Sequence, residues 1–151
     1  SLLKKISSGE SELAMSGALS PEDIFFRRLE IINATTADIS SVGHECEAEL
    51  VPEAAGSIEA MDALGVNTHL VSGGYQDIVE VVGQRVGVPK EHVHANAVTI
   101  NEGGFARLDP AASPLWTSNG KRVVLEVKNA KKNRKFYCNG WRWGYRCSSS
   151  P

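Results

Sequence analysis

A short run near the middle of the chain, HLVSGGYQDIVEVV, constrains the fold more than any other stretch. An apolar, β-forming segment ends in Ser72-Gly73-Gly74, and a helix-forming segment follows at once. Glycines let an anion approach the backbone, the first amides of a helix have no partner inside it, and the serine hydroxyl adds a donor. The run therefore predicts either a phosphate site at the end of a parallel strand or simply a tight connection.

Helical and extended segments alternate around this run. The spacing of apolar residues predicts one helix that stops at Gly65 and another that stops at Gly87 and Pro89. VNTHLVS, HVHANAVTI and FARLD read as extended segments, NEGG as a turn, and a last helix starts near Gly120. This alternation predicts right-handed βαβ units, and hence an α/β fold built on a parallel sheet.

An N-terminal helix is predicted from Ser20 onward, in SPEDIFFRRLEIIN. Ser20 suits an N-cap, and Phe25, Leu29 and Ile32 form one apolar stripe. Arg28 falls at the edge of that stripe, where a cation needs an anionic partner. A structural salt bridge, a snorkelling side chain or a bound anion would each satisfy it. TADISSVGHECEAEL predicts a further short helix, so the chain up to about residue 50 is expected to be helical.

Composition limits the possible classes of protein. The 151 residues, 42% of them hydrophobic, suffice for one domain with a core. No apolar run approaches the roughly 20 residues of a membrane span, and the start SLLKKISSGE lacks the apolar stretch of a signal peptide. We therefore expect a soluble, intracellular protein without a membrane partner. Cys46, Cys138 and Cys147 are widely spaced and match neither a zinc nor a disulfide pattern.

Several motifs, in order and spacing, resemble the phosphoserine phosphatases of the haloacid dehalogenase superfamily. The stretch LVPEAAGSIEAMDALGVNTHLVSGGYQDIVEVV is similar to that family's L-x-P-G and S-G-G-F segments, and GVPKEHVHANAVTINEGGFARLD is similar to its L-G-I-P, A-N-x-L and G-F-D segments. TSNGKRVVLEV resembles its S-G-G-K motif, and AMSGALSPEDIFFRRLEIINATTADI resembles its helical cap. The resemblance covers residues 14–128 and implies a haloacid dehalogenase-like α/β core with a helical cap, incomplete in this chain.

The resemblance also implies an activity. Members of the family hydrolyse L-phosphoserine to L-serine, in serine biosynthesis, through an aspartyl-phosphate intermediate with Mg²⁺ beside the nucleophile. By this resemblance Arg28 binds the carboxylate of the substrate. Met15 lines the pocket near the carbon skeleton of the substrate, although an ordinary core methionine would fit the same pattern.

Four further residues take roles from the same resemblance. Ser72 would hold a phosphate oxygen, Gly73 and Gly74 would let the backbone approach, and Lys121 would neutralise charge shared by phosphate and nucleophile. The implied partner is a small phosphomonoester rather than nucleic acid. The implied location is the cytoplasm, with an organelle as the alternative.

The carboxylates that this chemistry needs are missing from the chain. The family's nucleophile lies in a D-x-D-x-[TV] motif before the cap, whereas the first aspartate here is Asp23, and no G-D-G-x-x-D follows Lys121. Without these acids no aspartyl phosphate can form and Mg²⁺ lacks a hard oxygen site, so we expect an inactive chain that holds no metal. We interpret it as a product truncated at the front, with residues 10–50 as cap and 51–130 as core.

The C-terminal part of the chain departs in composition from the rest. Beyond Gly120 there are nine lysines or arginines but a single acid, and two of the three tryptophans lie there. One interpretation is a noncatalytic protein that uses this basic, aromatic tail on nucleic acid or a protein partner.

The alternative interpretation is that residues 131–151 are translated out of frame. Read one base later, Trp141 and Trp143 become glycine codons, whatever follows them. Arg142 and Arg146, if encoded as CGA, become aspartate. The shifted text can then read G-D-G-x-x-D at the place where the family has it. This interpretation accounts for the unusual composition without a nucleic-acid partner, and it is the one we favour.

Overall fold

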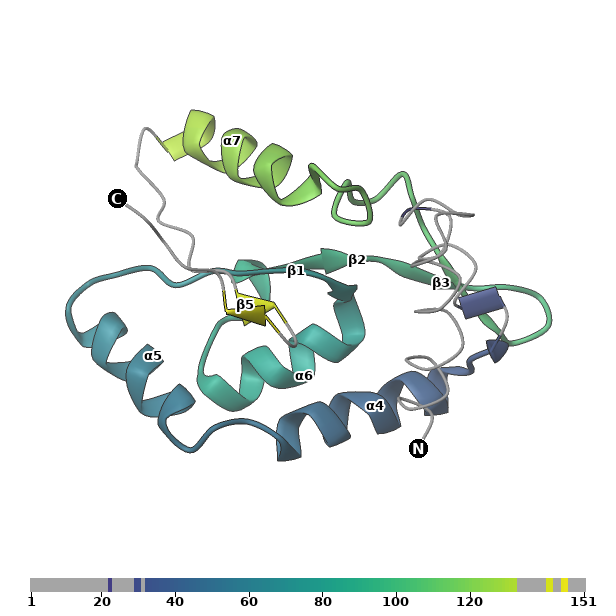
Figure 1. Cartoon of the computed structure of the whole chain (residues 1–151), viewed down its shortest axis with the longest axis horizontal. Helices are drawn as coiled ribbons and strands as arrows, with labels where there is room; N and C mark the ends of the chain where they lie inside the picture. Colours follow the sequence, from purple (N-terminus) through teal and green to yellow (C-terminus); the bar gives the residue numbers. More distant parts are fainter. Residues whose placement is uncertain (1–21, 23–28, 31, 133–140, 143–144, 147–151) are drawn as a thin grey trace.

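A computed structural model describes residues 22, 29–30, 32–132, 141–142 and 145–146 of the chain. Two parallel strands lie between helices on both sides (Figure 1). The helices are α4 (Thr36–Ala48), α5 (Glu53–Ala63), α6 (Gln76–Val86) and α7 (Gly120–Lys132), with a 3₁₀ helix η1 (Lys90–His92). The strands are β1 (Leu70–Tyr75), β2 (Val93–Asn96), β3 (Val98–Ile100), β4 (Ala106–Leu108), β5 (Trp141–Arg142) and β6 (Tyr145–Arg146).

The central unit is β1–α6–β2, in which α6 connects two parallel strands. α6 covers one face of the strand pair, α4 lies against α6, and α7 lies over the opposite face (Figure 1). β3 and β4 form an antiparallel hairpin. Its turn is the predicted NEGG, where Gly104 N donates to Asn101 O at 2.9 Å. The α/β fold with a parallel sheet, predicted from the sequence, is confirmed.

Local sequence explains where the helices begin and end. Thr35 caps α4: its Oγ1 accepts a hydrogen bond from Asp38 N, and the Asp38 carboxylate accepts one from Thr35 N at 2.9 Å. The bond from the Thr35 backbone lowers the pKa of Asp38. α6 ends where Gly87 adopts the left-handed conformation with φ +84°, as the predicted stop at this glycine requires.

β1 differs from its predicted extent at both ends. The sequence predicts an extended run over VNTHLVS, but residues 66–69 join no strand and β1 begins at Leu70. Val66 and Asn67 are exposed, so neither would gain from burial in a sheet. At the other end β1 continues through Ser72-Gly73-Gly74 to Tyr75, so these residues belong to the end of the strand.

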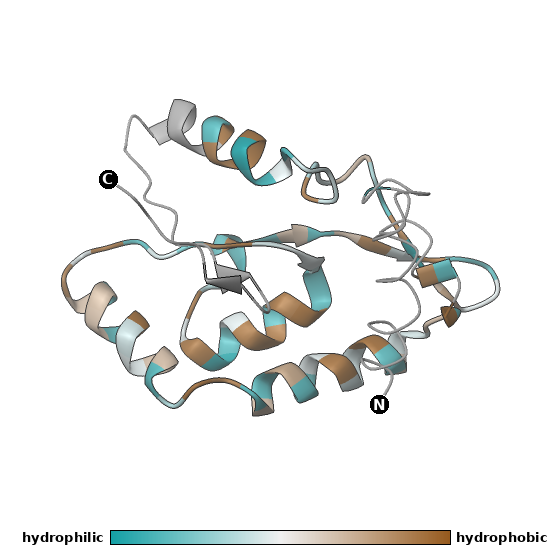
Figure 2. Cartoon of the chain, in the orientation of Figure 1, coloured by the Kyte–Doolittle hydropathy of each residue, from teal (hydrophilic) through white to brown (hydrophobic). Residues whose placement is uncertain are grey.

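Two clusters of buried side chains hold the layers together, and hydrophobic residues recur along α4 and α6 among hydrophilic ones (Figure 2). The first cluster joins α4 and the segment before it to the β3–β4 hairpin, and its members are Leu29, Ala34, Ile39, Ala106 and Leu108. The second joins the end of α6 to β2, and its members are Val86, Val88 and Val93. A Cβ at Gly83 would lie 2.8 Å from Val93 Cγ2, so α6 and β2 are in close contact.

Several sequence predictions lie partly outside the described residues. Leu29, in the apolar stripe predicted for the first helix, is buried, but residues 23–28 of that helix lie outside. The division into a cap at residues 10–50 and a core at residues 51–130 stays a prediction. The first buried cluster draws on both segments. Among the helices that the structure describes, none is long and apolar enough to cross a membrane.

Candidate functional site

Residues 72–74 form a bulge in β1, where the pairing of β1 with β2 is irregular. Val71 is opposite His94 and Tyr75 is opposite Asn96, so β1 advances four residues where β2 advances two. The backbone between these two points is therefore turned out of the ladder, directly before the first turn of α6. An anion at this place can meet backbone donors that the sheet does not use.

Two hydrogen bonds fix the conformation of the bulge. Gly74 N donates to Ser72 Oγ at 3.0 Å, and Asn96 Nδ2 donates to Gly73 O at 2.9 Å. A hydroxyl that accepts one bond can still donate its proton, so Ser72 keeps a donor for a phosphate oxygen. A Cβ at Gly74 would lie 3.2 Å from Ser72 Oγ and would crowd the hydroxyl. Glycine at this position therefore preserves the arrangement.

Asn96 is a residue of this site that the sequence analysis missed. It is 0% exposed, and its Oδ1 is buried without a hydrogen-bond partner among the described residues. Leaving such an oxygen without a donor costs about 1–3 kcal/mol, so a ligand or water that donates to it would be stabilised. The signal was the asparagine of the A-N-x-L resemblance, a polar residue between Ala95 and Ala97 to which the sequence analysis gave no role.

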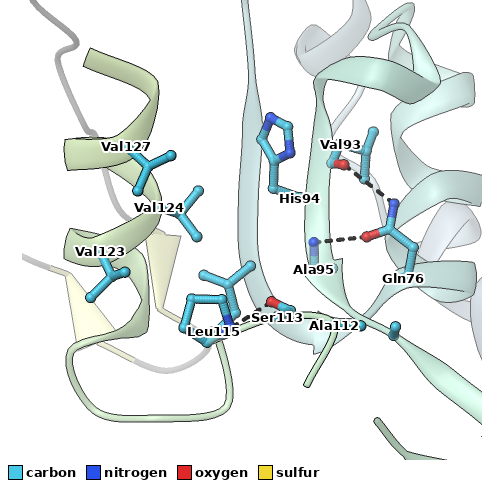
Figure 3. A pocket seen from close by; sticks show the side chains of 12 residues that line it. Gln76, Val93, His94, Ala95, Ala112, Ser113, Leu115, Val123, Val124 and Val127 are labelled. Atoms are coloured by element: carbon cyan, nitrogen blue, oxygen red, sulfur yellow. Dashed lines mark hydrogen bonds between the residues drawn. The ribbon is translucent and has the colours of Figure 1, made fainter. Parts of the chain in front are cut away.

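Gln76 ties the start of α6 to β2 beside the bulge. Its Oε1 accepts a hydrogen bond from Ala95 N at 2.8 Å, and its Nε2 donates to Val93 O at 3.3 Å (Figure 3). Nε2 also donates to Glu80 Oε1 at 2.8 Å. The side chain thus satisfies backbone groups of β2. It fixes the first turn of α6, whose amides face the same end of β1.

The loop before α7 packs against the bulge from the other side. A Cβ at Gly73 would lie 3.5 Å from Leu115 O. A Cβ at Gly120 would collide with Pro114 O and would lie 2.6 Å from Leu115 Cα. Only glycine at position 120 lets the helix start approach this loop so closely. Leu115 therefore lies close both to the bulge and to the start of α7.

Lys121 lies in the first turn of α7 and is exposed. Within the described part of the chain, no hydrogen bond or ion pair joins it to Ser72 or Gly73. The structure thus groups Ser72, Gly73 and Gly74 and places the helix of Lys121 next to them, without contact between side chains. The predicted substrate residues Arg28 and Met15 lie outside the described residues, and their roles stay predictions.

A hollow of about 390 Å³ lies between α7 and β2 (Figure 3). The α7 side is formed by Val123, Val124 and Val127, and the β2 side includes Val93 and His94. Its lining is mostly apolar, so it does not suit a free phosphate group. The bulge, with its hydroxyl and backbone donors, remains the candidate anion site.

The Mg²⁺ implied by the family resemblance does not fit the donors that are described. Mg²⁺ in proteins is bound through carboxylates and other oxygen ligands. In the described segments no group of three acidic, histidine or cysteine side chains could hold a metal ion. After the bulge, Asp77 is exposed, and Glu80 already binds Lys90 Nζ at 2.9 Å as well as Gln76. Cys46 is a free thiol whose pKa is raised by burial and by Glu45, which makes it a weak ligand.

Comparison with known proteins places these features in context. No family model matches the chain. Among curated proteins, it is 28% identical over 122 residues to a phosphoserine phosphatase of Mus musculus and 27% identical over 119 residues to one of Homo sapiens. Each match covers 78% of this chain and 52% of the relative, so the chain spans about half the length of these relatives. A chloroplastic phosphoserine phosphatase of Arabidopsis thaliana is 23% identical over 120 residues, covering 78% of this chain and 40% of that protein.

A solved structure shares the fold. The crystal structure of a phosphoserine phosphohydrolase-like protein from Francisella tularensis superimposes with a TM-score of 0.66 at 22% sequence identity. The match covers 86% of this chain and 59% of that chain. The sequence similarity to phosphoserine phosphatases and the α/β fold, both predicted from the sequence, are therefore confirmed, and the fold is shared with a phosphoserine phosphohydrolase-like protein.

Proposed function

We propose that the bulge at residues 72–74 binds the phosphate group of a small phosphomonoester, with L-phosphoserine as the first candidate. The observation that carries this proposal is the bulge itself, which Asn96 and Ser72 hold out of the ladder at the start of α6. The similarity to proteins named phosphoserine phosphatase supports the substrate class.

In this proposal each residue has a separate task. Ser72 Oγ donates to a phosphate oxygen while it accepts from Gly74 N. Lys121 adds positive charge at the start of α7, on the side from which Leu115 contacts the bulge. Arg28 pairs with the carboxylate of the amino acid, and Met15 contacts its carbon skeleton.

We further propose that the chain as given binds this ligand without hydrolysing it. In the complete family enzyme, Mg²⁺ would support attack by an aspartate, but the sequence contains no D-x-D motif to supply that nucleophile. Binding, orientation and charge neutralisation are the steps that the residues present can perform. We place the protein in the cytoplasm or, because one relative is chloroplastic, in an organelle.

Binding is tested by calorimetric titration with phosphoserine, with serine as the ligand that lacks the phosphate group. Phosphoserine should bind and serine should not. Ser72→Ala should weaken phosphoserine binding about tenfold, because about 1.4 kcal/mol is the size of one hydrogen bond to a charged group. Ser57→Ala, at an exposed position in α5, is the matched control and should bind normally. Equal binding of serine and phosphoserine would refute the phosphate site.

Catalysis is tested by phosphate release from phosphoserine in the presence of Mg²⁺. We expect only background release, since the missing carboxylates account for many orders of magnitude in rate. Ser72→Ala and Lys121→Ala preparations serve as contamination controls, because an impurity would give the same rate in all three. A rate typical of enzymes that falls in both variants would show that the chain is catalytic.

We also propose that residues 131–151 are read out of frame, and the coding nucleotides test this directly. The bases that encode Arg142 and Arg146 should each have adenine in the third position, because only then does the shifted frame give aspartate before the following thymine. Any other third base at either position would exclude the G-D-G-x-x-D reading. A tail that binds single-stranded nucleic acid would instead favour the noncatalytic binding protein.

A further inference from the structure

Three of the four histidines of the chain meet at the end of β1 opposite the bulge. His69 directly precedes β1, His92 belongs to η1, and His94 lies in β2. His69 Nδ1 is 3.1 Å from His94 Nε2, and the ring centroids of His69 and His92 are 4.0 Å apart. All three are partly buried. Imidazoles change charge near neutral pH, so their mutual contact makes this end of the strand pair sensitive to protons.

The geometry of His69 and His94 is that of a hydrogen bond between two rings. Their centroids are 5.4 Å apart, their facing nitrogens 3.1 Å, and their planes are inclined by 16°. The centroid distance exceeds the distance between the facing nitrogens by 2.3 Å. A ring nitrogen lies about 1.1 Å from its centroid, so this difference is about twice that length. The two nitrogens therefore point straight at each other. Two ligands of one metal ion would instead be directed at a third point, about 2 Å from each nitrogen.

We propose that His69 and His94 form a single proton-binding site that fastens β1 to β2 near neutral pH and opens in acid. In the neutral pair, one ring donates N–H to the lone pair of the other. One proton taken from water leaves that bond in place, as N–H⁺ donating to N. A second proton removes the acceptor and sets two charged donors against each other at 3.1 Å.

His92 lies beside the pair. Its ring lies against that of His69, with the planes inclined by 30°. Because a doubly protonated pair sets two like charges at 3.1 Å, the folded pair takes up fewer protons in acid than two separate imidazoles and titrates as a coupled unit.

The direction of the pH effect follows from this difference in proton uptake. In the unfolded chain the imidazoles are independent and bind protons as the pH falls through about 6.5. Because the folded cluster binds fewer protons than the unfolded chain does, the free energy of unfolding falls as the pH falls. The contribution is complete above about pH 7, and below it each excluded proton lowers the folding equilibrium constant by up to tenfold per pH unit.

The charged groups on the neighbouring elements are carboxylates, lysines and arginines, not histidines. The charged residues whose side chains are described on α5, α6, η1 and α7, the helices packed against the strand pair or its connection, are Glu53, Glu59, Asp62, Asp77, Glu80, Arg85, Lys90, Glu91, Lys121, Arg122 and Glu126. Aspartate and glutamate ordinarily titrate near pH 4, and lysine and arginine above pH 10. A change between pH 7.5 and 5 therefore reports on histidine. The inference does not depend on what the bulge binds.

The first experiment measures stability by urea unfolding of the full chain at several pH values from 7.5 to 5. The wild type should lose at least tenfold in its folding equilibrium constant over this range. His69→Gln and His94→Gln should each remove most of that loss, since each variant removes one of the two rings that oppose each other's protonation. His44→Gln is the matched control, because His44 is exposed on α4 beside Glu47 and lies outside the cluster. A wild-type profile as flat as that of His94→Gln would overturn the proposal.

The second experiment uses the wild type alone and does not depend on folded variants. Nitrogen chemical shifts of the imidazoles, followed by NMR over the same pH range, should show His69 and His94 changing together in two steps more than one pH unit apart. Independent single steps with overlapping midpoints would contradict the shared proton. Zn²⁺ is then added to the wild type and to both glutamine variants. The proposal predicts that Zn²⁺ stabilises none of them. Stabilisation of the wild type that is absent from both variants would indicate a metal site in place of the proton site.

Discussion

The two ends of β1 are held by different chemistry. At the carboxyl end, the bulge is fixed by uncharged groups, the hydroxyl of Ser72 and the amide of Asn96. At the amino end, His69 and His94 join the strands through a bond that depends on one proton. Uncharged hydrogen bonds do not change between pH 5 and 8, whereas imidazoles do. One strand pair thus combines a proposed anion site of constant geometry with an attachment that should weaken in acid.

Gly120→Ala should have the largest effect on stability, because Gly120 packs against the loop that lies beside the carboxyl end of β1. The new Cβ would collide with Pro114 O and approach Leu115 Cα, and relief requires movement of backbone. We expect a loss of about 3 kcal/mol in the free energy of unfolding, measured with urea. Gly56→Ala is the matched control: it meets nothing within 4 Å inside α5 and should stabilise by about 0.5–1 kcal/mol. Equal effects of the two would show that the loop does not support the bulge.

Asn96→Ala should come next, since it removes the bond to Gly73 O from a fully buried site. We expect a loss of about 2 kcal/mol, the same at pH 7.5 and pH 5.5, together with weaker phosphoserine binding. Asn67→Ala, on an exposed loop residue, controls for loss of an asparagine. If Asn96→Ala also abolished the acid dependence, the two ends of β1 would be coupled and the comparison would fail.

Gln76→Ala should have a smaller effect, because Gln76 joins α6 to β2 between the two ends. Its loss leaves Ala95 N without the acceptor 2.8 Å away, but Gln76 itself is only half-buried, so less buried surface is lost than with Asn96. We expect about 1 kcal/mol, measured by thermal unfolding. Gln84→Ala, exposed on the same helix, should change the melting temperature little. An equal shift in both variants would indicate helix propensity rather than the bond to β2.

Asp38→Asn should have the smallest effect, because Asp38 caps α4 and belongs to neither end of β1. The pKa of Asp38 is lowered mainly by the hydrogen bond from Thr35 N. Its stabilisation is therefore complete above the unfolded pKa and lost as the pH falls through the lower folded value. The variant should flatten only the most acidic part of the stability profile, below about pH 4, with Asp62→Asn as the control. If the stability of Asp38→Asn no longer changed between pH 7 and 5, the assignment of that pH range to histidine would be wrong.

The sequence predicted those features that depend on local preference. The stop at Gly87 follows from backbone conformation, and the alternation of elements follows from the spacing of apolar residues. The grouping of Ser72, Gly73 and Gly74 follows from a short motif that is contiguous in the sequence, whereas their roles stay predictions. The beginning of β1 was misplaced because Val66 and Asn67 can be extended without being paired.

What the sequence alone determined is therefore the order of elements, the α/β class and the Ser-Gly-Gly strand end before a helix, because each depends on neighbouring residues. Tertiary structure decided which distant groups meet: Asn96 with Gly73 across two strands, and His69 with His94 across twenty-five positions. These contacts depend on the register of a parallel pair whose strands are separated by a whole helix. A shift of one residue would turn each of these side chains to the opposite face, and no local pattern fixes that register.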